Sequence, residues 1–151
     1  MKRKNIKLTI EGTSPLLMNR FHEEAQQKVE GGTALAVNGD RGTPREQAEP
    51  KVYQDSKNRT VLPGPNFFSC LSKAGKYHKV GKSKVTTYTS SLVPAGISVV
   101  ELESEVLGPN GKSATWEVDS RPIVNPSTKG RRLCHRPRFD RWQVAFTLDV
   151  D

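Results

Sequence analysis

The sequence is short of cysteine, of long apolar runs and of targeting signals. Only two cysteines occur among 151 residues, Cys70 and Cys134, and neither has a CxxC partner or a histidine at metal-ligand spacing. They predict reduced thiols in a cytoplasmic protein, with a disulfide left open as the alternative. No apolar stretch approaches the roughly 18 residues that span a bilayer, and the basic opening MKRKNIKLTIEG lacks the apolar segment of a signal peptide. We therefore expect no membrane contact.

The compact motifs that mark common enzymes are also missing. The chain contains no HExxH, no GxSxG and no Walker A loop, and its three histidines are scattered at positions 22, 78 and 135. This pattern predicts neither a cofactor nor a bound metal and favours a protein that is not an enzyme. The one catalytic candidate is Asp40, which as part of a nuclease subunit would cleave RNA with the help of a metal ion.

Positive charge is what the sequence has in excess. Lys and Arg number 24 against 16 Asp and Glu, which gives a net charge of +8, and the pI is near 9.7. The hydrophobic fraction is only 34% and the mean hydropathy is −0.63. Such a balance predicts an anionic partner, and nucleic acid is the commonest one. The alternative is charge that only keeps the protein dissolved.

The densest cluster of cations precedes the last strand expected in the chain. Arginine suits phosphate because its planar guanidinium donates to two oxygens at once, and interleaved aromatic or histidine rings can stack on bases. The alternative is a solvated hairpin whose cations neutralise nearby glutamates. Because Trp142 begins an alternating strand, we assign its ring to the core. The candidate phosphate ligands are Lys129, Arg131, Arg132, Arg136 and Arg138, with His135 and Phe139 as candidate stacking rings.

A second basic cluster lies on and beyond an expected helix. Lys73, Lys76 and Lys79 are its candidate nucleic-acid ligands, and Lys82 and Lys84 continue it. Lysines on a helix surface are commonly no more than solvated side chains, so both interpretations stay open. The last member of the predicted nucleic-acid-binding set is Arg20, which follows the short apolar segment Leu-Leu-Met at positions 16–18.

Hydrophobic periodicity predicts an α+β fold in one domain, residues 1–151. Residues 4–11 and 142–150 alternate apolar and polar side chains, as half-buried antiparallel strands do. Residues 66–79 follow a Pro-Gly-Pro start signal and predict a helix with Phe67, Cys70, Leu71 and Ala74 on its apolar face. Residues 97–107 and 115–124 flank an Asn-Gly turn and predict a hairpin, and a second hairpin is expected through residues 125–130.

Residues 31–59 contain many Gly and Pro and few large apolar side chains, which predicts a long irregular insertion. The whole pattern suits a ferredoxin-like or RRM-like antiparallel sheet with one main helix, in which the first and last strands are central or adjacent.

Three segments together resemble a known family. IKLTIEGTSPLLMNRF resembles the first strand of the RAMP proteins of CRISPR-associated effector complexes, and VLPGPNFFSCLSKAGK is similar to the Pro-led turn that opens their first main helix. SRPIVNPSTKGRRLCHRPRFDRW and QVAFTLDVD look like small RAMP-like proteins of phages and mobile elements. The resemblance covers roughly half of the chain. It implies an RRM-like backbone subunit that binds guide RNA, assembles side by side along it, and projects residues 31–59 as a thumb.

The resemblance also has a departure. RAMP proteins carry a second helix and a glycine-rich loop after the strand that ends here at Asp151. Without that helix one face of the sheet would be partly uncovered, so we expect other subunits or self-association. Two non-enzymatic alternatives remain open: a single-stranded DNA-binding protein of a phage or mobile element, and an interaction or inhibitor module that mimics a RAMP subunit.

Overall fold

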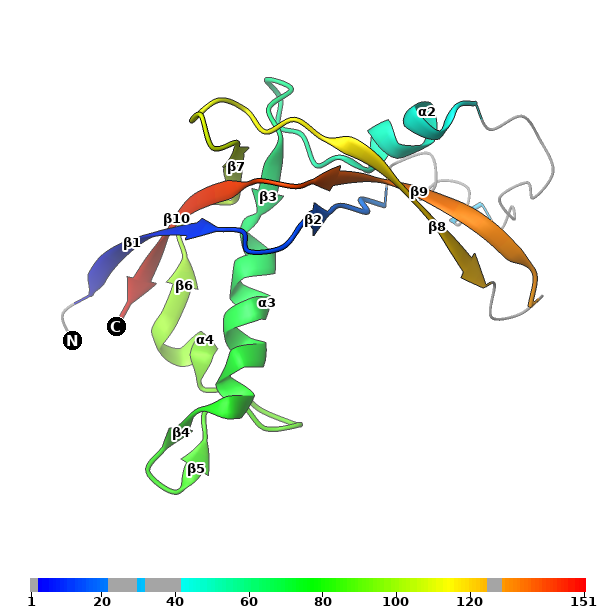
Figure 1. Cartoon of the computed structure of the whole chain (residues 1–151). Coiled ribbons are helices and arrows are strands. Elements are labelled where there is room, and N and C mark those ends of the chain that lie inside the picture. Colours follow the sequence, from blue (N-terminus) through cyan, green and yellow to red (C-terminus); the bar gives the residue numbers. More distant parts are fainter. Residues whose placement is uncertain (1–2, 22–29, 32–41, 125–128) are drawn as a thin grey trace.

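The computed structural model describes residues 3–21, 30–31, 42–124 and 129–151, and shows a mixed α+β fold built mainly from antiparallel strands (Figure 1). The α+β prediction is confirmed. Within the described residues, no helix is long and apolar enough to cross a membrane.

The larger sheet is built around the C-terminal strand β10, Gln143–Val150. Strand β1, Lys4–Glu11, pairs with β10 along its whole length, so the predicted adjacency of the two alternating strands is confirmed. The other side of β10 is shared by β6, Ile97–Val99, and β7, Glu103–Leu107. Strand β3, Val61–Pro63, then adds beyond β7, so the order is β1-β10-β7-β3 with β6 beside β10.

Helix α3, Gly64–Ala74, packs on one face of this sheet. Phe67 stacks on Phe146 of β10 with ring centroids 4.2 Å apart. The predicted helix is confirmed in type but ends earlier, because a 3-10 turn η2, Gly75–Tyr77, replaces its last residues. Of its predicted apolar face, Phe67 is buried and Leu71 packs against the core, but Cys70 and Ala74 are exposed.

Two glycines also lie on the buried side of α3 and η2. A Cβ built on Gly64 would lie 2.3 Å from the carbonyl oxygen of Glu101, and one on Gly75 would lie 2.4 Å from the Oγ1 of Thr86. Because glycine has no side chain, the helix approaches Glu101 and Thr86 more closely than it could with any other residue at these two positions. The buried stripe runs through Gly64, Phe67 and Gly75, a pattern that a count of apolar side chains does not detect.

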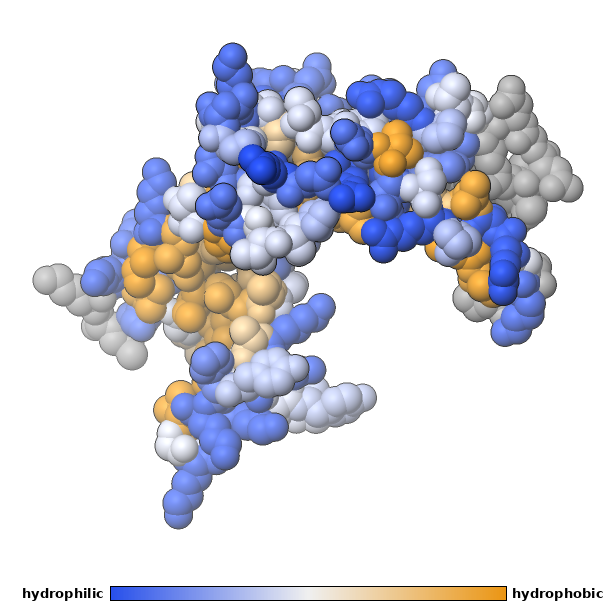
Figure 2. Space-filling model, in the orientation of Figure 1, coloured by the Kyte–Doolittle hydropathy of each residue, from blue (hydrophilic) through white to orange (hydrophobic). Residues whose placement is uncertain are grey.

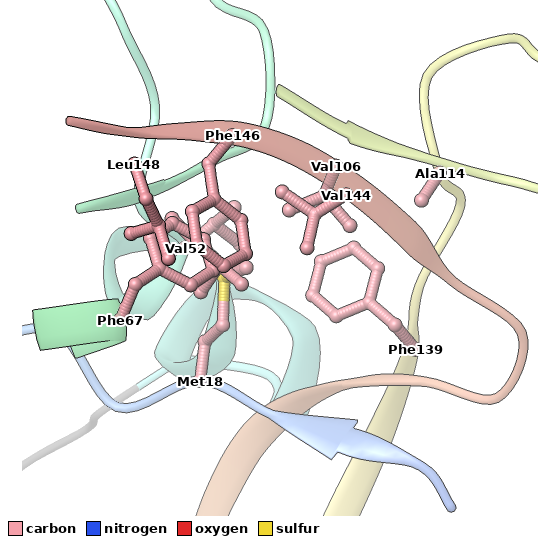
Figure 3. Close-up of a cluster of buried hydrophobic side chains, with 10 residues drawn as sticks. Met18, Val52, Phe67, Val106, Ala114, Phe139, Val144, Phe146 and Leu148 are labelled. Carbon is pink, nitrogen blue, oxygen red and sulfur yellow. The ribbon is translucent and has the colours of Figure 1, made fainter. Parts of the chain in front are cut away.

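The hydrophobic core joins the larger sheet to the second one (Figure 3). Phe139 and Val106 are fully buried, and Met18 follows the short strand β2, Leu16–Leu17. The buried cluster consists of Met18, Val52, Leu62, Phe67, Val106, Ala114, Phe139, Val144, Phe146 and Leu148.

The second sheet is a long hairpin with a short third strand. β9, Arg131–Phe139, lies between β8, Glu117–Val124, and β2, Leu16–Leu17. The hairpin expected through residues 125–130 is confirmed by the pairing of Val124 with Arg131; residues 125–128 lie outside the described part. The other predicted hairpin is wrong, because β7 pairs with β3 and β10 while β8 pairs with β9. The Asn-Gly turn closes only a bridge between Leu107 and Ser113.

The stretch predicted as an irregular insertion is partly ordered against β9. Helix α2, Pro44–Ala48, begins at a capping box in which the Thr43 hydroxyl accepts from the Glu46 N–H and the Glu46 carboxylate accepts from the Thr43 N–H. The turn η1, Glu49–Lys51, follows. Ala48 is 0% exposed and Val52 is 2% exposed, so this end of the insertion belongs to the core. Residues 32–41, which include Asp40, lie outside the described residues.

Glu101 links the bend between β6 and β7 to the central strand β10 through hydrogen bonds. Its carboxylate accepts hydrogen bonds from the backbone N–H of Thr147 at 2.6 Å and from the Thr147 hydroxyl at 2.7 Å. Burial alone would raise the pKa of Glu101, but these hydrogen bonds outweigh it and hold the pKa below its ordinary value. A carboxyl with a lowered folded pKa stabilises the fold above its unfolded pKa, and that contribution is lost as pH falls through the folded pKa.

We therefore expect Glu101→Gln to lower the free energy of unfolding by about 1 kcal/mol at neutral pH and by less below about pH 4. Urea unfolding at pH 7 and pH 3 measures the difference. Glu103→Gln, at an exposed glutamate two residues along, is the control and should change neither value. A loss for Glu101→Gln that is the same at both pH values would contradict this role.

Candidate nucleic-acid interface

The first candidate surface is a basic projection beyond helix α3, which we call the lysine lobe and define as residues 73–92. It contains the end of α3, η2 and a small hairpin of β4, Lys79–Val80, and β5, Ser83–Lys84. The Val85 N–H donates to the His78 carbonyl, and the Thr86 N–H donates to the Gly75 carbonyl. These bonds hold the loop after β5 against η2, so the lobe is one folded unit (Figure 1). Helix α4, Val93–Gly96, leads from it back to β6.

The lobe concentrates like charges that repel one another. Lys79 lies directly opposite Lys84 across the β4–β5 pair, and Lys82 lies in the connecting turn. None of the five lysines of the lobe has an ion-pair partner among the residues that the structure describes. Like charges placed opposite each other destabilise a strand pair. An arrangement that weakens its own hairpin is typical of a site that binds an anion.

Two tyrosine side chains of the same lobe are exposed to solvent. Tyr77 in η2 is 88% exposed, and Tyr88 in the loop after β5 is fully exposed. Beside lysines, exposed aromatic rings offer faces on which the bases of single-stranded nucleic acid can stack. An open hollow runs from Tyr77 along the outer side of α3, past Lys73 and Cys70. The lobe therefore combines cations for a phosphate chain with rings for bases.

The arginines of the β8–β9 hairpin fall into two groups. Arg136 contacts Asp119 at 3.6 Å, and Arg138 contacts Asp140 at 2.6 Å, so a phosphate would have to compete with these carboxylates. Arg131 and Arg132 are exposed at the outer end of β9 and have no ion pair among the described residues. Consecutive residues of a strand point to opposite faces, so these two guanidinium groups lie on different sides of the hairpin. Lys129, also exposed, precedes them.

The rings interleaved with these arginines are not available for stacking. His135 is 8% exposed and its Nδ1 is 2.7 Å from the Ser120 hydroxyl, while Phe139 is fully buried. The structure thus corrects the prediction that these two rings contact bases. Trp142 packs against the core, and its indole N–H donates to the Ser14 carbonyl at 2.9 Å, which agrees with its assignment to the core.

Arg20 lies near the base of the hairpin and not near the lysine lobe. It is half-buried, and its backbone N–H donates to the carbonyl of Lys51. The Lys51 ammonium in turn donates to the His135 carbonyl on the edge of β9. Figure 1 shows the hairpin and the lobe as two limbs that leave the body in different directions, so the two predicted basic clusters do not form one patch. Figure 2 shows a mostly hydrophilic surface on the lobe and a mixture of hydrophilic and apolar surface on the hairpin.

Four residues of the lobe are missing from the predicted binding set: Lys82, Lys84, Tyr77 and Tyr88. A signal for them exists in the sequence, because residues 56–100 contain no Asp and no Glu. A long stretch without carboxylates leaves its lysines without local partners. The exposure of Tyr88 depends on how the loop folds back on η2 and has no comparable signal.

Catalytic and metal chemistry find no support in the described part of the chain. No group of three or more His, Cys, Asp and Glu residues there could hold a metal ion. The carboxylates of Asp55, Asp119 and Asp140 are engaged with arginines, and Asp40 is not among the described residues. Cys70 and Cys134 are both free thiols.

Neither a protein-family model nor a curated protein matches the sequence.

Proposed function

We propose that this chain is an RNA-binding protein, a backbone-type subunit of a CRISPR-like ribonucleoprotein that holds guide RNA mainly through its phosphates. The observation that carries RNA binding is the lysine lobe, with five lysines that have no ion pair among the described residues, Lys79 opposite Lys84, and two exposed tyrosines on one small folded unit. The assignment to a RAMP-like subunit rests on the sequence resemblance.

Phosphate contacts account for the chemistry of this surface. Lysine is a flexible point charge with no geometric demand on its partner, so a row of lysines follows a phosphate chain without reading bases. Binding of this kind releases counterions, and affinity falls steeply as salt rises. Little sequence preference is expected, because the lobe contains no Arg, Asn, Gln, Asp or Glu, the side chains that most often pair with base edges.

The hairpin supplies a second, weaker contact. Arg131 and Arg132 have no ion pair among the described residues, and a strand of RNA that reaches from the lobe to the hairpin would cross the body between the two limbs. We also propose that the larger sheet is a variant of the ferredoxin-like arrangement of RAMP proteins. Its support is one main helix on an antiparallel sheet whose first and last strands pair. The free thiols suit the cytoplasm, where we place the protein.

The test is the affinity of the purified, nuclease-treated protein for a fluorescent single-stranded RNA, measured by anisotropy across a range of salt concentrations. We expect the logarithm of the binding constant to fall linearly with the logarithm of salt. For single strands the slope is about −0.7 for each phosphate neutralised. No binding at low salt, or an affinity that salt does not change, would refute RNA binding through phosphates.

The lobe is tested by a matched pair of double variants. Lys79→Gln with Lys84→Gln removes two cations from the lobe and also removes their repulsion, so lost binding cannot come from a weakened hairpin. We expect the salt slope to become shallower by about 1.4, the share of two phosphate contacts on a single strand. Lys57→Gln with Lys112→Gln removes the same charge from exposed lysines outside the lobe and should change the slope little. Equal effects of the two pairs would show a diffuse charge effect instead of a site.

Competition with single-stranded DNA of the same sequence separates the two nucleic acids. Preference for RNA supports the guide-RNA subunit. Equal or stronger binding of DNA would favour the single-stranded DNA-binding protein instead, with the same lobe as its site.

A further inference from the structure

We infer that strand β1 pairs, antiparallel, with β1 of a second copy of this chain and so joins two molecules through their larger sheets. The inference is independent of RNA binding and rests on three observations: a free sheet edge in the described part of the chain, half-exposed apolar side chains along it, and a residue pattern that matches itself in one antiparallel register without placing like charges opposite each other.

The edge of the larger sheet is unpaired along β1. In the described part of the chain, β1 pairs with β10 on one side and with no strand on the other. It has eight residues without proline or bulge. A free edge of this length presents a row of unpaired N–H and C=O groups and is a template for another strand.

The apolar side of β1 is poorly covered. Ile6 is 37% exposed and Ile10 is 39% exposed, while Leu8 between them is half-buried against the core. Their partners on β10, Leu148, Val144 and Phe146, are buried. Figure 2 shows apolar surface gathered where β1, β6 and α3 lie. The core therefore continues to the sheet edge and is left open there.

The hydrogen bonds of β1 show which backbone groups are free. The Gly12 N–H donates to the Trp142 carbonyl, in the register of the β1–β10 pair. Hydrogen-bonded pairs alternate along an antiparallel ladder, so even-numbered residues of β1 bond to β10. The odd-numbered residues Asn5, Lys7, Thr9 and Glu11 therefore direct their N–H and C=O groups to the free edge.

A second β1 satisfies these groups in one register particularly well. When Leu8 faces Leu8 of the other copy, Ile6 faces Ile10 and the apolar rows of the two strands become continuous. On the other side of the sheet, Lys7 then lies opposite Thr9, and Asn5 lies opposite Glu11. All four odd-numbered residues form hydrogen-bonded pairs, and no like charges meet head-on.

The neighbouring registers are worse for physical reasons. A shift of two residues in one direction places Lys7 directly opposite Lys7 of the other copy, and like charges opposite each other are destabilising. A shift in the other direction brings Lys7 opposite Glu11 of the other copy, but it places Ile6 opposite Gly12, so the apolar rows no longer match along the strand, and it leaves three hydrogen-bonded pairs in place of four. A shift of one residue turns the apolar rows to opposite faces. A second copy in the Leu8-centred register is thus the occupant that fits this edge.

The test uses opposite charges at position 9, whose side chain is exposed and faces Lys7 of the partner. Thr9→Lys creates two Lys–Lys pairs across the two-fold axis, and Thr9→Glu creates two Lys–Glu pairs. We expect the dimer dissociation constant to rise about tenfold in the first variant and to fall about tenfold in the second. Sedimentation velocity of nuclease-treated protein measures it, and thermal unfolding checks that the monomer fold is unchanged.

A charge swap identifies the register. Thr9→Lys combined with Lys7→Glu restores an opposite-charge pair across the axis, and dimerisation should return to the level of the unaltered chain. The inference is overturned if even Thr9→Glu is a monomer at high concentration, if Thr9→Lys and Thr9→Glu change the dimer alike, if the double variant does not recover, or if open-ended assemblies form instead of dimers.

Discussion

Phe146→Ala is expected to lower the free energy of unfolding by about 3–5 kcal/mol, the range for removal of a buried phenylalanine. Phe146 is 3% exposed on the central strand β10, and its ring stacks on Phe67 of helix α3. Its neighbour across the sheet is Leu8 of β1, which is itself half-buried. Loss of the ring opens a cavity and also removes the contact that fixes α3 to the sheet. Because the free energy of unfolding of such a domain is about 5–15 kcal/mol, this one change removes a large part of it.

Chemical denaturation followed by circular dichroism measures the loss, and the midpoint of thermal unfolding should fall by roughly 10 °C. Leu102→Ala is the control, because Leu102 is 85% exposed and its removal should cost less than about 0.5 kcal/mol. A Phe146→Ala variant as stable as Leu102→Ala would show that α3 is not packed on β10 as described.

Alternation along the chain predicts the first and last strands well. Residues 4–11 and 143–150 pair over their full length, because each has an apolar row that only a sheet can bury. Local sequence patterns do not predict how the other strands pair. The Asn-Gly turn after β7 predicts that β7 and β8 form a hairpin, yet β7 is held by β3 and β10, which lie far away in the sequence. Long-range burial overrides turn chemistry there.

The sequence predicts where the positive charges of the candidate site lie, but not which side chains contact them. The lysines predicted on and after the helix form the lysine lobe, and the arginines predicted before the last strand lie on the β8–β9 hairpin. It does not show that Asp119 lies against Arg136, or that Asp140 lies against Arg138. Nor does it show that His135, read as a base-stacking ring, is turned into the protein against Ser120. Availability to a ligand depends on these contacts, which only the folded chain brings together.

Tyr77→Ala combined with Tyr88→Ala is expected to weaken binding of single-stranded RNA by at least tenfold at moderate salt. Stacking of a base on an aromatic ring contributes about 1–3 kcal/mol by alanine substitution, and both rings are exposed on the lysine lobe. Because neither tyrosine carries charge at neutral pH, the slope of affinity against salt should stay as steep as in the unaltered protein. The measurement is the same anisotropy titration at several salt concentrations, and it separates stacking from the phosphate contacts of the lysines.

Phenylalanine at both positions keeps the rings and removes only the hydroxyl groups, so Tyr77→Phe with Tyr88→Phe should bind nearly as well as the original chain. A duplex RNA of the same sequence hides its base faces and should show little difference between the alanine and phenylalanine pairs. If the alanine pair binds single-stranded RNA as tightly as the phenylalanine pair, the tyrosines are not a stacking platform. If the alanine pair instead changes the salt slope, the two rings act by positioning lysines, and the lobe reads phosphate alone.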